Sequence, residues 1–146
     1  MILIENRQKK IKIEKSRTRK TVRRILKGLE CPDREISILL VDDSQIERMN
    51  KRYLGRIGPT NVISFPMAEG DFGGINPHIL GDVVISLETA KREAEESGTS
   101  LNEIIDFLLI HGILHLLGYN HETSDVEARV MEAKEEEIFD EITSET

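Results

Sequence analysis

The chain has 146 residues, of which 38% are apolar and 32% are charged, and its formal net charge at pH 7 is −7. This length and composition predict one soluble globular domain over residues 1–146, and no apolar run approaches the roughly 20 residues that a membrane span needs. A lone cysteine, Cys31, excludes an internal disulfide and a cysteine-based structural zinc site, so we expect a reducing, cytoplasmic setting.

Charge is distributed unevenly along the chain. The first 30 residues carry 11 basic and three acidic side chains, whereas the remainder carries 9 basic and 24 acidic ones. Such asymmetry is typical of a chain whose basic end faces a polyanion, although a solvated basic face on a strand and a helix explains the same charges. The negative net charge therefore does not exclude a nucleic-acid partner.

Hydrophobic periodicity predicts the first elements. Ile2–Asn6 and residues 10–13 have the pattern of extended segments, and a helix is expected from about Thr18 to a break at 31–33. Glu35–Val41 is rich in β-branched residues and leucine, as a buried strand is. The apolar residues of the helix recur at i, i+3, i+4 and i+7, and are Val22, Ile25, Leu26 and Leu29.

Between residues 44 and 98 the sequence predicts short elements separated by turns. Ser44 and Glu47 form a capping box, which marks the start of a helix. Gly98 follows a polar helical stretch, in the place of a capping glycine. The predicted elements are a helix from Ser44, a loop at 54–60, a strand at 62–65, an exposed loop at 69–78, a strand at 80–86 and a helix over Leu87–Ser97.

The rest of the chain predicts two helices. Ser100 begins a capping box, and the residues that follow are apolar on nearly every side until Gly118, which predicts a buried central helix. Ser124 begins a further capping box, which predicts the start of an acidic helix. The residues of this helix that are expected to face inward are Val126, Val130, Met131, Ile138 and Phe139. Strands that alternate with helices, some too close in sequence for crossover connections, predict an α/β fold with a mixed sheet packed with helices.

Three of the four histidines fall within the segment HGILHLLGYNH, residues 111–121. His111 and His115 are one helical turn apart and can direct two ring nitrogens at one point. Gly118 can take a positive φ, so that the returning chain supplies a third nitrogen from His121. Two imidazoles in the most apolar helix need a partner, because an unpaired buried polar group costs about 1–3 kcal/mol. A metal ion is that partner, and we predict that the three histidines are its ligands.

Three neutral imidazoles around Zn²⁺ leave an open fourth position, which is typical of catalytic rather than structural zinc sites. Water bound there would have its pKa lowered to about 7, and the ion would stabilise the anionic oxygens of a phosphodiester or tetrahedral transition state. The spacing therefore predicts metal-assisted hydrolysis with one zinc ion per chain. His111, His115 and His121 are catalytic in this hypothesis through metal-bound water.

The spacing H-x-x-x-H-x-x-G-x-x-H also occurs in the metzincin proteases, in which a glutamate directly follows the first histidine and acts as general base. Here that position is Gly112. A hydrolase with a different substrate is therefore the first hypothesis, and a metzincin-like metallopeptidase lacking the usual glutamate is the second.

Three sequence blocks carry a more specific resemblance. HGILHLLGYNH is similar to H-G-x-L-H-L-x-G-Y-D-H, PTNVISFP (59–66) to P-T-D-V-L-S-F-P, and LGDVVIS (80–86) to L-G-D-I-x-I-S. In this order and spacing, these blocks resemble those of the YbeY-type rRNA maturation factors, which are zinc-dependent bacterial endoribonucleases. The resemblance covers most of the chain.

The resemblance implies a zincin-like fold, zinc held by His111, His115 and His121, and cleavage of single-stranded RNA. The implied role is in small-subunit ribosomal RNA maturation and ribosome quality control, with RNA, the small ribosomal subunit and ribosome-associated proteins as partners. Asp82 of the third block is a further candidate, as a base or as a residue that orients a ligand or a water. A carboxylate that serves only a turn is the alternative for Asp82.

The sequence departs from the family pattern at three positions. Asn61 and Asn120 replace aspartates, and Leu54 stands where the family has an arginine after a tyrosine. Arg56, two residues later, is a candidate to bind RNA phosphate in its place, together with the basic N-terminal segment. Because that arginine is missing, a third hypothesis stands beside the two hydrolases: a non-catalytic ribosome-assembly factor that binds RNA and is stabilised by metal.

Overall fold

The structure is a computed structural model that describes residues 1–67, 78–120 and 122–144. The predicted loop at 69–78 lies outside these residues, except for His78, which is exposed. No helix in the described part is long and apolar enough to cross a membrane. The elements are, in chain order, β1 (Ile2–Asn6), α1 (Lys15–Gly28), β2 (Glu35–Val41), α2 (Asp43–Leu54), β3 (Val62–Pro66), β4 (Ile79–Ser86), α3 (Leu87–Ser97), α4 (Leu101–Leu116) and α5 (Asp125–Ser144).

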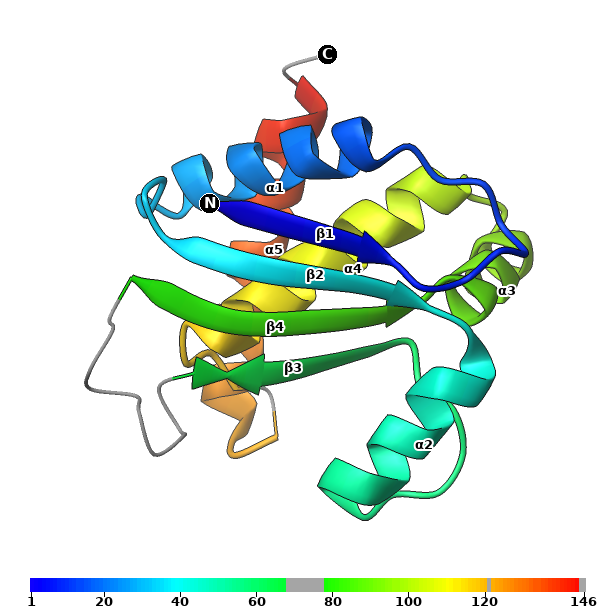
Figure 1. The fold of residues 1–146 in the computed structure, drawn as a ribbon. Helices are drawn as coiled ribbons and strands as arrows, with labels where there is room; N and C mark the ends of the chain where they lie inside the picture. Colours follow the sequence, from blue (N-terminus) through cyan, green and yellow to red (C-terminus); the bar gives the residue numbers. More distant parts are fainter. Residues whose placement is uncertain (68–77, 121, 145–146) are drawn as a thin grey trace.

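The strands of the described chain form one four-stranded sheet in the order β1-β2-β4-β3 (Figure 1). β1 pairs in parallel with β2, and β2 pairs in parallel with β4, whereas β3 is antiparallel to β4. The helix α1 supplies the crossover between the parallel strands β1 and β2. The prediction of an α/β fold with a mixed sheet is therefore confirmed.

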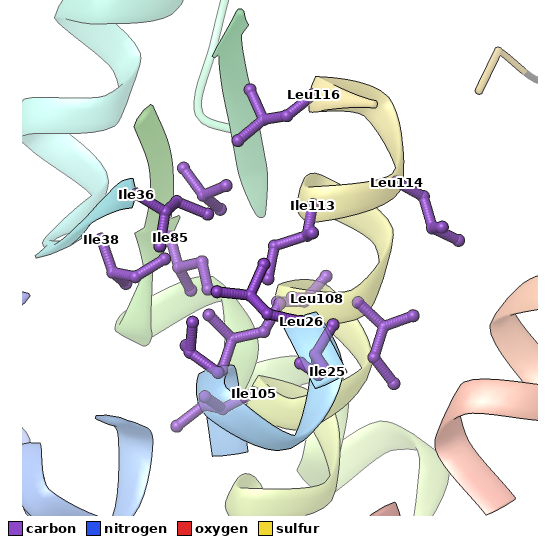
Figure 2. Close-up of a cluster of buried hydrophobic side chains, with 14 of the residues drawn as sticks. Ile25, Leu26, Ile36, Ile38, Ile85, Ile105, Leu108, Ile113, Leu114 and Leu116 are labelled. Carbon is purple, nitrogen blue, oxygen red and sulfur yellow. The ribbon is translucent and has the colours of Figure 1, made fainter. Parts of the chain in front are cut away.

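The main hydrophobic core lies between one face of the sheet and helices α1, α4 and α5. Figure 2 shows Ile25 and Leu26 of α1, Ile113 of α4 and the strand residues Ile38 and Ile85, all of which belong to this core. α4 is buried along most of its length, which confirms the prediction of a buried central helix. A smaller core on the opposite face, under α2, consists of Val41, Ile46, Ile63 and Val84.

The predicted starts of α3, α4 and α5 are confirmed, and that of α2 is wrong. The hydroxyls of Ser100 and Ser124 each accept a hydrogen bond from the backbone N–H three residues later, at 3.1 Å. At α2 the N-cap is Asp42 rather than Ser44, and its carboxylate accepts from the backbone N–H three residues on, at 2.9 Å. The Ser44 hydroxyl instead accepts from the Arg48 guanidinium. α2 therefore begins two residues earlier than the predicted capping box requires.

Three further expectations, which concern the N-terminal part of the chain and the last helix, are wrong. Residues 10–13 do not form a strand, because the Gln8 side chain bonds both backbone groups of Ile11, at 2.8 and 2.9 Å. α1 begins nearly one turn earlier than predicted. On α5, Val126 and Val130 are 62% and 54% exposed. The buried positions of that helix are Met131, Glu135, Ile138 and Ile142.

A partly buried polar cluster joins the start of α2 to the start of α3. The Asp43 carboxylate accepts hydrogen bonds from the hydroxyls of Ser86 and Thr89, each at 2.6 Å, and pairs with the Arg92 guanidinium at 2.8 Å. Burial by itself raises the pKa of Asp43, but the hydrogen bonds from Ser86, Thr89 and Arg92 outweigh it. Together they hold the pKa of this carboxyl below its ordinary value of 3.8.

This cluster predicts a pH-dependent contribution to stability. Because the pKa of Asp43 is lower in the folded state, its contribution is complete above the unfolded pKa, near 4, and is lost as the pH falls through the folded value. We expect Asp43→Asn to lower the free energy of unfolding by about 1–3 kcal/mol at pH 7. The difference from wild type should shrink between about pH 5 and pH 3. Urea unfolding at several pH values checks this, with exposed Asp33→Asn as control; a difference independent of pH would contradict it.

Candidate functional site

Two of the predicted ligands converge on one helix. His111 and His115 lie one turn apart near the C-terminal end of α4, and their Nε2 atoms are 3.2 Å from each other. The ring centroids are 4.7 Å apart and the ring planes are nearly perpendicular, at 78°. Both side chains are only partly buried, so the point on which the two nitrogens converge is open to a cleft.

The other ring nitrogen of His111 is bound by a carboxylate. Glu135 of α5 places Oε2 at 3.1 Å from His111 Nδ1, and its side chain is only 7% exposed. When this carboxylate is ionised it can only accept, so the Nδ1–H of His111 donates to it and Nε2 keeps its lone pair on the side that faces His115. Metal-binding histidines are commonly oriented by such a carboxylate.

Glu135 is not among the residues predicted from the sequence, although its position carries a signal. It lies on the buried stripe of α5, between Met131 and Ile138, where the spacing calls for an apolar residue. A glutamate is almost never buried unless it is paired. A charged residue on an apolar stripe therefore indicates a buried partner, but the sequence does not show that this partner is His111.

The turn after α4 has the geometry predicted for it. Gly118 has a φ of +99°, its N–H bonds the His115 carbonyl, and the N–H of Tyr119 bonds the Leu114 carbonyl, each at 3.0 Å. These two bonds form a Schellman motif, in which a glycine accommodates the left-handed residue. The turn sends the chain back along the end of α4, toward the position of His121 in the sequence.

The third predicted ligand, His121, lies outside the described residues. Among residues 1–67, 78–120 and 122–144, no three His, Cys, Asp or Glu side chains form a group that could hold a metal ion. His111 and His115 nevertheless fit one. Two nitrogens bound to a tetrahedral zinc ion at about 2.0–2.1 Å lie roughly 3.3 Å apart, close to the 3.2 Å between their Nε2 atoms. The pair could therefore supply two ligands to zinc without rearrangement.

A cleft of about 410 Å³ opens beside the two histidines. Its walls are β3 with the loop that precedes it, the end of α4 and the turn that follows α4. Arg56, predicted to bind substrate, lines this cleft and forms a 3.9 Å ion pair with Glu122 on the other wall. The structure thus brings Arg56 and two of the predicted metal ligands to one place.

The positions that depart from the family pattern also line this cleft: Leu54, Asn61 and Asn120. Asn120 has a local role, since its side-chain oxygen accepts a hydrogen bond from the Glu122 backbone N–H at 2.9 Å. The Asn61 side-chain amide lies 3.5 Å from a carboxylate oxygen of Glu93 on α3. Asn61 and Asn120 thus contribute polar side chains to the wall of the cleft, and Leu54 contributes an apolar one.

Asp82 does not reach the cleft. It lies on β4 between Val83, which faces α4, and Gly81. Because side chains alternate along a strand, Asp82 lies on the other face of the sheet, on the same side as its pairing partner Phe65 and the smaller core under α2. Asp82 is also absent from the residues that line the cleft. The structure therefore separates this predicted catalytic candidate from the histidines.

Gly112 lets α4 pack closely against the sheet. A Cβ placed on it would lie 2.7 Å from Val83 Cγ1 and 3.2 Å from Ser64 Oγ. The Ser64 hydroxyl donates a hydrogen bond to the Gly112 carbonyl at 2.9 Å, which holds α4 against β3. A glutamate at position 112, where the metzincins have their general base, would therefore point into the sheet. No space for a carboxylate exists there.

Comparison with known proteins agrees with these features. The family model described as Endoribonuclease YbeY matches residues 3–143. A protein of that name from Geobacter metallireducens is 55% identical over 94% of this chain and 93% of its own length. Another, from Syntrophotalea carbinolica, is 51% identical over 99% of this chain and 97% of its own length.

The fold also matches a solved structure. The solution structure of TM1509 from Thermotoga maritima superposes with a TM-score of 0.69, over 99% of this chain and 91% of that one. At 24% identity this likeness concerns the fold. The match of the family model over nearly the whole chain, and relatives at 50% identity or more, decide the family. The chain belongs to the endoribonuclease YbeY family.

Proposed function

We propose that this chain is a zinc-dependent endoribonuclease that cleaves single-stranded RNA in the cytoplasm, in small-subunit ribosomal RNA maturation and ribosome quality control. Family membership supports the endoribonuclease activity, because the relatives at 50–55% identity carry that name. The observation that carries the proposal for this chain is the convergence of His111 and His115 Nε2, 3.2 Å apart, beside a cleft that also holds Arg56.

The metal site of the proposal consists of His111, His115 and His121, with one zinc ion per chain, on a zincin-like arrangement around α4. Bound zinc would supply a Lewis acid that activates water and stabilises negative charge developing on phosphate oxygens. Other residues of the chain would hold the histidine side chains in place before zinc binds. Glu135 fixes the tautomer and orientation of His111, and Ser64 holds the helix that carries both histidines against β3.

Arg56 is the phosphate-binding residue of the proposal. Its side chain is 63% exposed and that of Glu122 is 61% exposed, and such an exposed ion pair contributes only about 0–1 kcal/mol. Phosphate oxygens can replace the Glu122 carboxylate at little cost, because an arginine guanidinium binds phosphate through paired hydrogen bonds. Arg56 would then hold the RNA backbone beside the two histidines, in the role that the family arginine after the tyrosine is implied to have.

The cleft offers little to distinguish one base from another. The chain has only two tyrosines and four phenylalanines, and among the described residues Tyr119 is the one of these six that lines the cleft. Base stacking on aromatic side chains contributes about 1–3 kcal/mol per base, so few stacking positions predict weak sequence preference. A single strand can present its backbone to the histidines without the cost of opening a duplex.

An RNA cleavage assay tests this function. Zinc-loaded protein is incubated with a single-stranded RNA, the same RNA in a duplex, and an unstructured peptide. We expect cleavage of the single strand at internal positions, much slower cleavage of the duplex, and no cleavage of the peptide. RNA binding without cleavage would support the metal-stabilised assembly factor and overturn the enzyme. Cleavage of the peptide alone would support the metallopeptidase.

A substitution at Glu135 tests how the metal site is held. Glu135→Gln keeps the shape of the side chain but removes the charge that fixes His111, so we expect zinc affinity to fall by about 10-fold to 100-fold. Competition with a chromogenic chelator measures that affinity, and circular dichroism checks the fold. Glu136→Gln, at the exposed neighbouring position, is the matched control and should bind zinc as wild type does. Equal affinity in the two variants would remove Glu135 from the site.

A further inference from the structure

Three basic side chains lie close together at the edge of the sheet opposite the cleft. Arg23 and Lys27 of α1 and Arg34 of the following loop line a hollow of about 400 Å³ beside the start of β1. The other described residues that line it are Met1, Ile2 and Pro32, so no acidic side chain of the described part of the chain borders it. Every charged side chain of α1 is basic.

These three cations lack the partners that neutralise other basic residues of the same region. Arg17, on the same helix, is held by both oxygens of Asp106, at 3.1 and 2.9 Å. Within the described residues, by contrast, Arg23, Lys27 and Arg34 form no salt bridge, and the buried Nε of Arg34 has no hydrogen-bond acceptor. Three basic side chains around one hollow, with no ion-pair partner among the described residues, create a positive potential that favours an anionic ligand such as phosphate.

The cleft runs along β3, and its Pro66 end lies at the same end of the sheet as the hollow. One row of paired residues crosses all four strands there: Ile2 pairs with Ile36, Ile36 with Gly81, and Gly81 with Pro66. Ile2 lines the hollow and Pro66 lines the cleft. Neighbouring strands are about 4.8 Å apart, so three steps separate the hollow from this end of the cleft by roughly 14 Å. In Figure 1 this is the end at which β1, β2 and β4 begin and β3 ends.

We propose that Arg23, Lys27 and Arg34 form a phosphate-binding site that holds the backbone of an RNA strand whose neighbouring segment lies in the cleft. The inference rests on the proposed function, because it takes the ligand in the cleft to be RNA. A separation of roughly 14 Å corresponds to about four nucleotides at the 3.4 Å rise of a stacked strand. The site therefore favours substrates long enough to reach from the cleft to α1, and it adds affinity without base preference.

RNA length separates this site from the cleft in a binding experiment. Fluorescence anisotropy measures the binding of a 20-nucleotide and a 3-nucleotide single-stranded RNA in the His115→Ala background, which keeps the RNA intact. Arg23→Ala/Lys27→Ala is compared with Lys51→Ala/Lys91→Ala, which removes the same charge at exposed positions that line neither the hollow nor the cleft. Circular dichroism confirms that each variant is folded.

We expect the Arg23/Lys27 variant to bind the 20-nucleotide RNA about 10-fold more weakly near 0.1 M salt. The slope of log affinity against log salt should fall by about 1.4, since each lost phosphate contact on a single strand removes about 0.7. Binding of the 3-nucleotide RNA should be unchanged, and the control variant should resemble its parent. An unchanged affinity for the long RNA, or an equal loss with the short one, would overturn the site. Failure of the zinc-loaded wild type to cleave any RNA would instead overturn the proposed function, and the binding result would stand apart from it.

Discussion

Replacing His115 with alanine is expected to reduce cleavage of single-stranded RNA by more than about 100-fold and to remove most of the bound zinc. Substitutions of residues that only support a metal ligand cost about 10-fold to 100-fold in affinity or activity, so the loss of a ligand itself should exceed that range. His115 supplies one of the two Nε2 atoms that converge beside the cleft. Without it, His111 keeps its Glu135 partner but has no neighbouring nitrogen on α4 with which to share an ion.

The experiment compares cleavage rate and metal content in wild type, His115→Ala and His78→Ala. His78 is exposed and does not line the cleft, so its replacement controls for the loss of a histidine elsewhere. Wild type and His78→Ala should hold about one zinc ion per chain and cleave alike. Cleavage by His115→Ala at the wild-type rate would show that the activity comes from another site or another protein.

Introducing glutamate at position 112 is expected to unfold the protein rather than to create a peptidase. The Cβ alone would lie 2.7 Å from Val83 Cγ1, and the rest of the side chain would be forced into the sheet. Overpacking a core costs about 1–3 kcal/mol, and burying an unpaired carboxylate adds to that cost, so we expect a loss of at least about 3 kcal/mol in unfolding free energy. Gly112→Ala, which adds only the Cβ, should cost less.

Urea unfolding and a peptide cleavage assay test this prediction together. Asn102→Glu adds the same side chain to an exposed position of the same helix and should leave stability within about 0.5 kcal/mol of wild type. A Gly112→Glu protein that is as stable as this control would show that α4 does not pack on β4 at Gly112. Peptide cleavage by such a protein would support the metallopeptidase hypothesis.

The fold was largely predictable because its signals are local. Ser100 and Ser124 cap the helices they were expected to cap, and Gly98 and Gly118 follow helix ends with positive φ values of +70° and +99°. The errors arise where two local signals compete. Asp42 and Ser44 are both good N-caps, and only the end of β2 at Val41 decides between them.

The candidate site was predictable only in part, because much of it depends on contacts between distant segments. His111 and His115 are close in sequence, so helical geometry alone brings them together. Glu135 meets His111 only through the packing of α5 on α4, and no local pattern indicates that contact. Asp82 was an attractive candidate by sequence, but the alternation of β4 places it across the sheet from both histidines.

The uneven charge of the chain has a structural counterpart. Much of the basic N-terminal segment forms α1, along one edge of the sheet, while the acidic remainder includes α5. Arg23 and Lys27 form a candidate phosphate site only in the folded protein, in which Arg34 lies beside them. The same fold places the hollow and the Pro66 end of the cleft at one end of the sheet. The sequence shows the excess of charge but not this alignment.

The most direct test of the account is a zinc titration of metal-free protein during RNA cleavage. Protein stripped by a chelator receives increasing zinc, and the cleavage rate of a single-stranded RNA is measured at each ratio. The account predicts no cleavage by the stripped protein and a rate that rises linearly and saturates at one zinc ion per chain. Full activity of the stripped protein, or a rate that does not depend on added zinc, would contradict it.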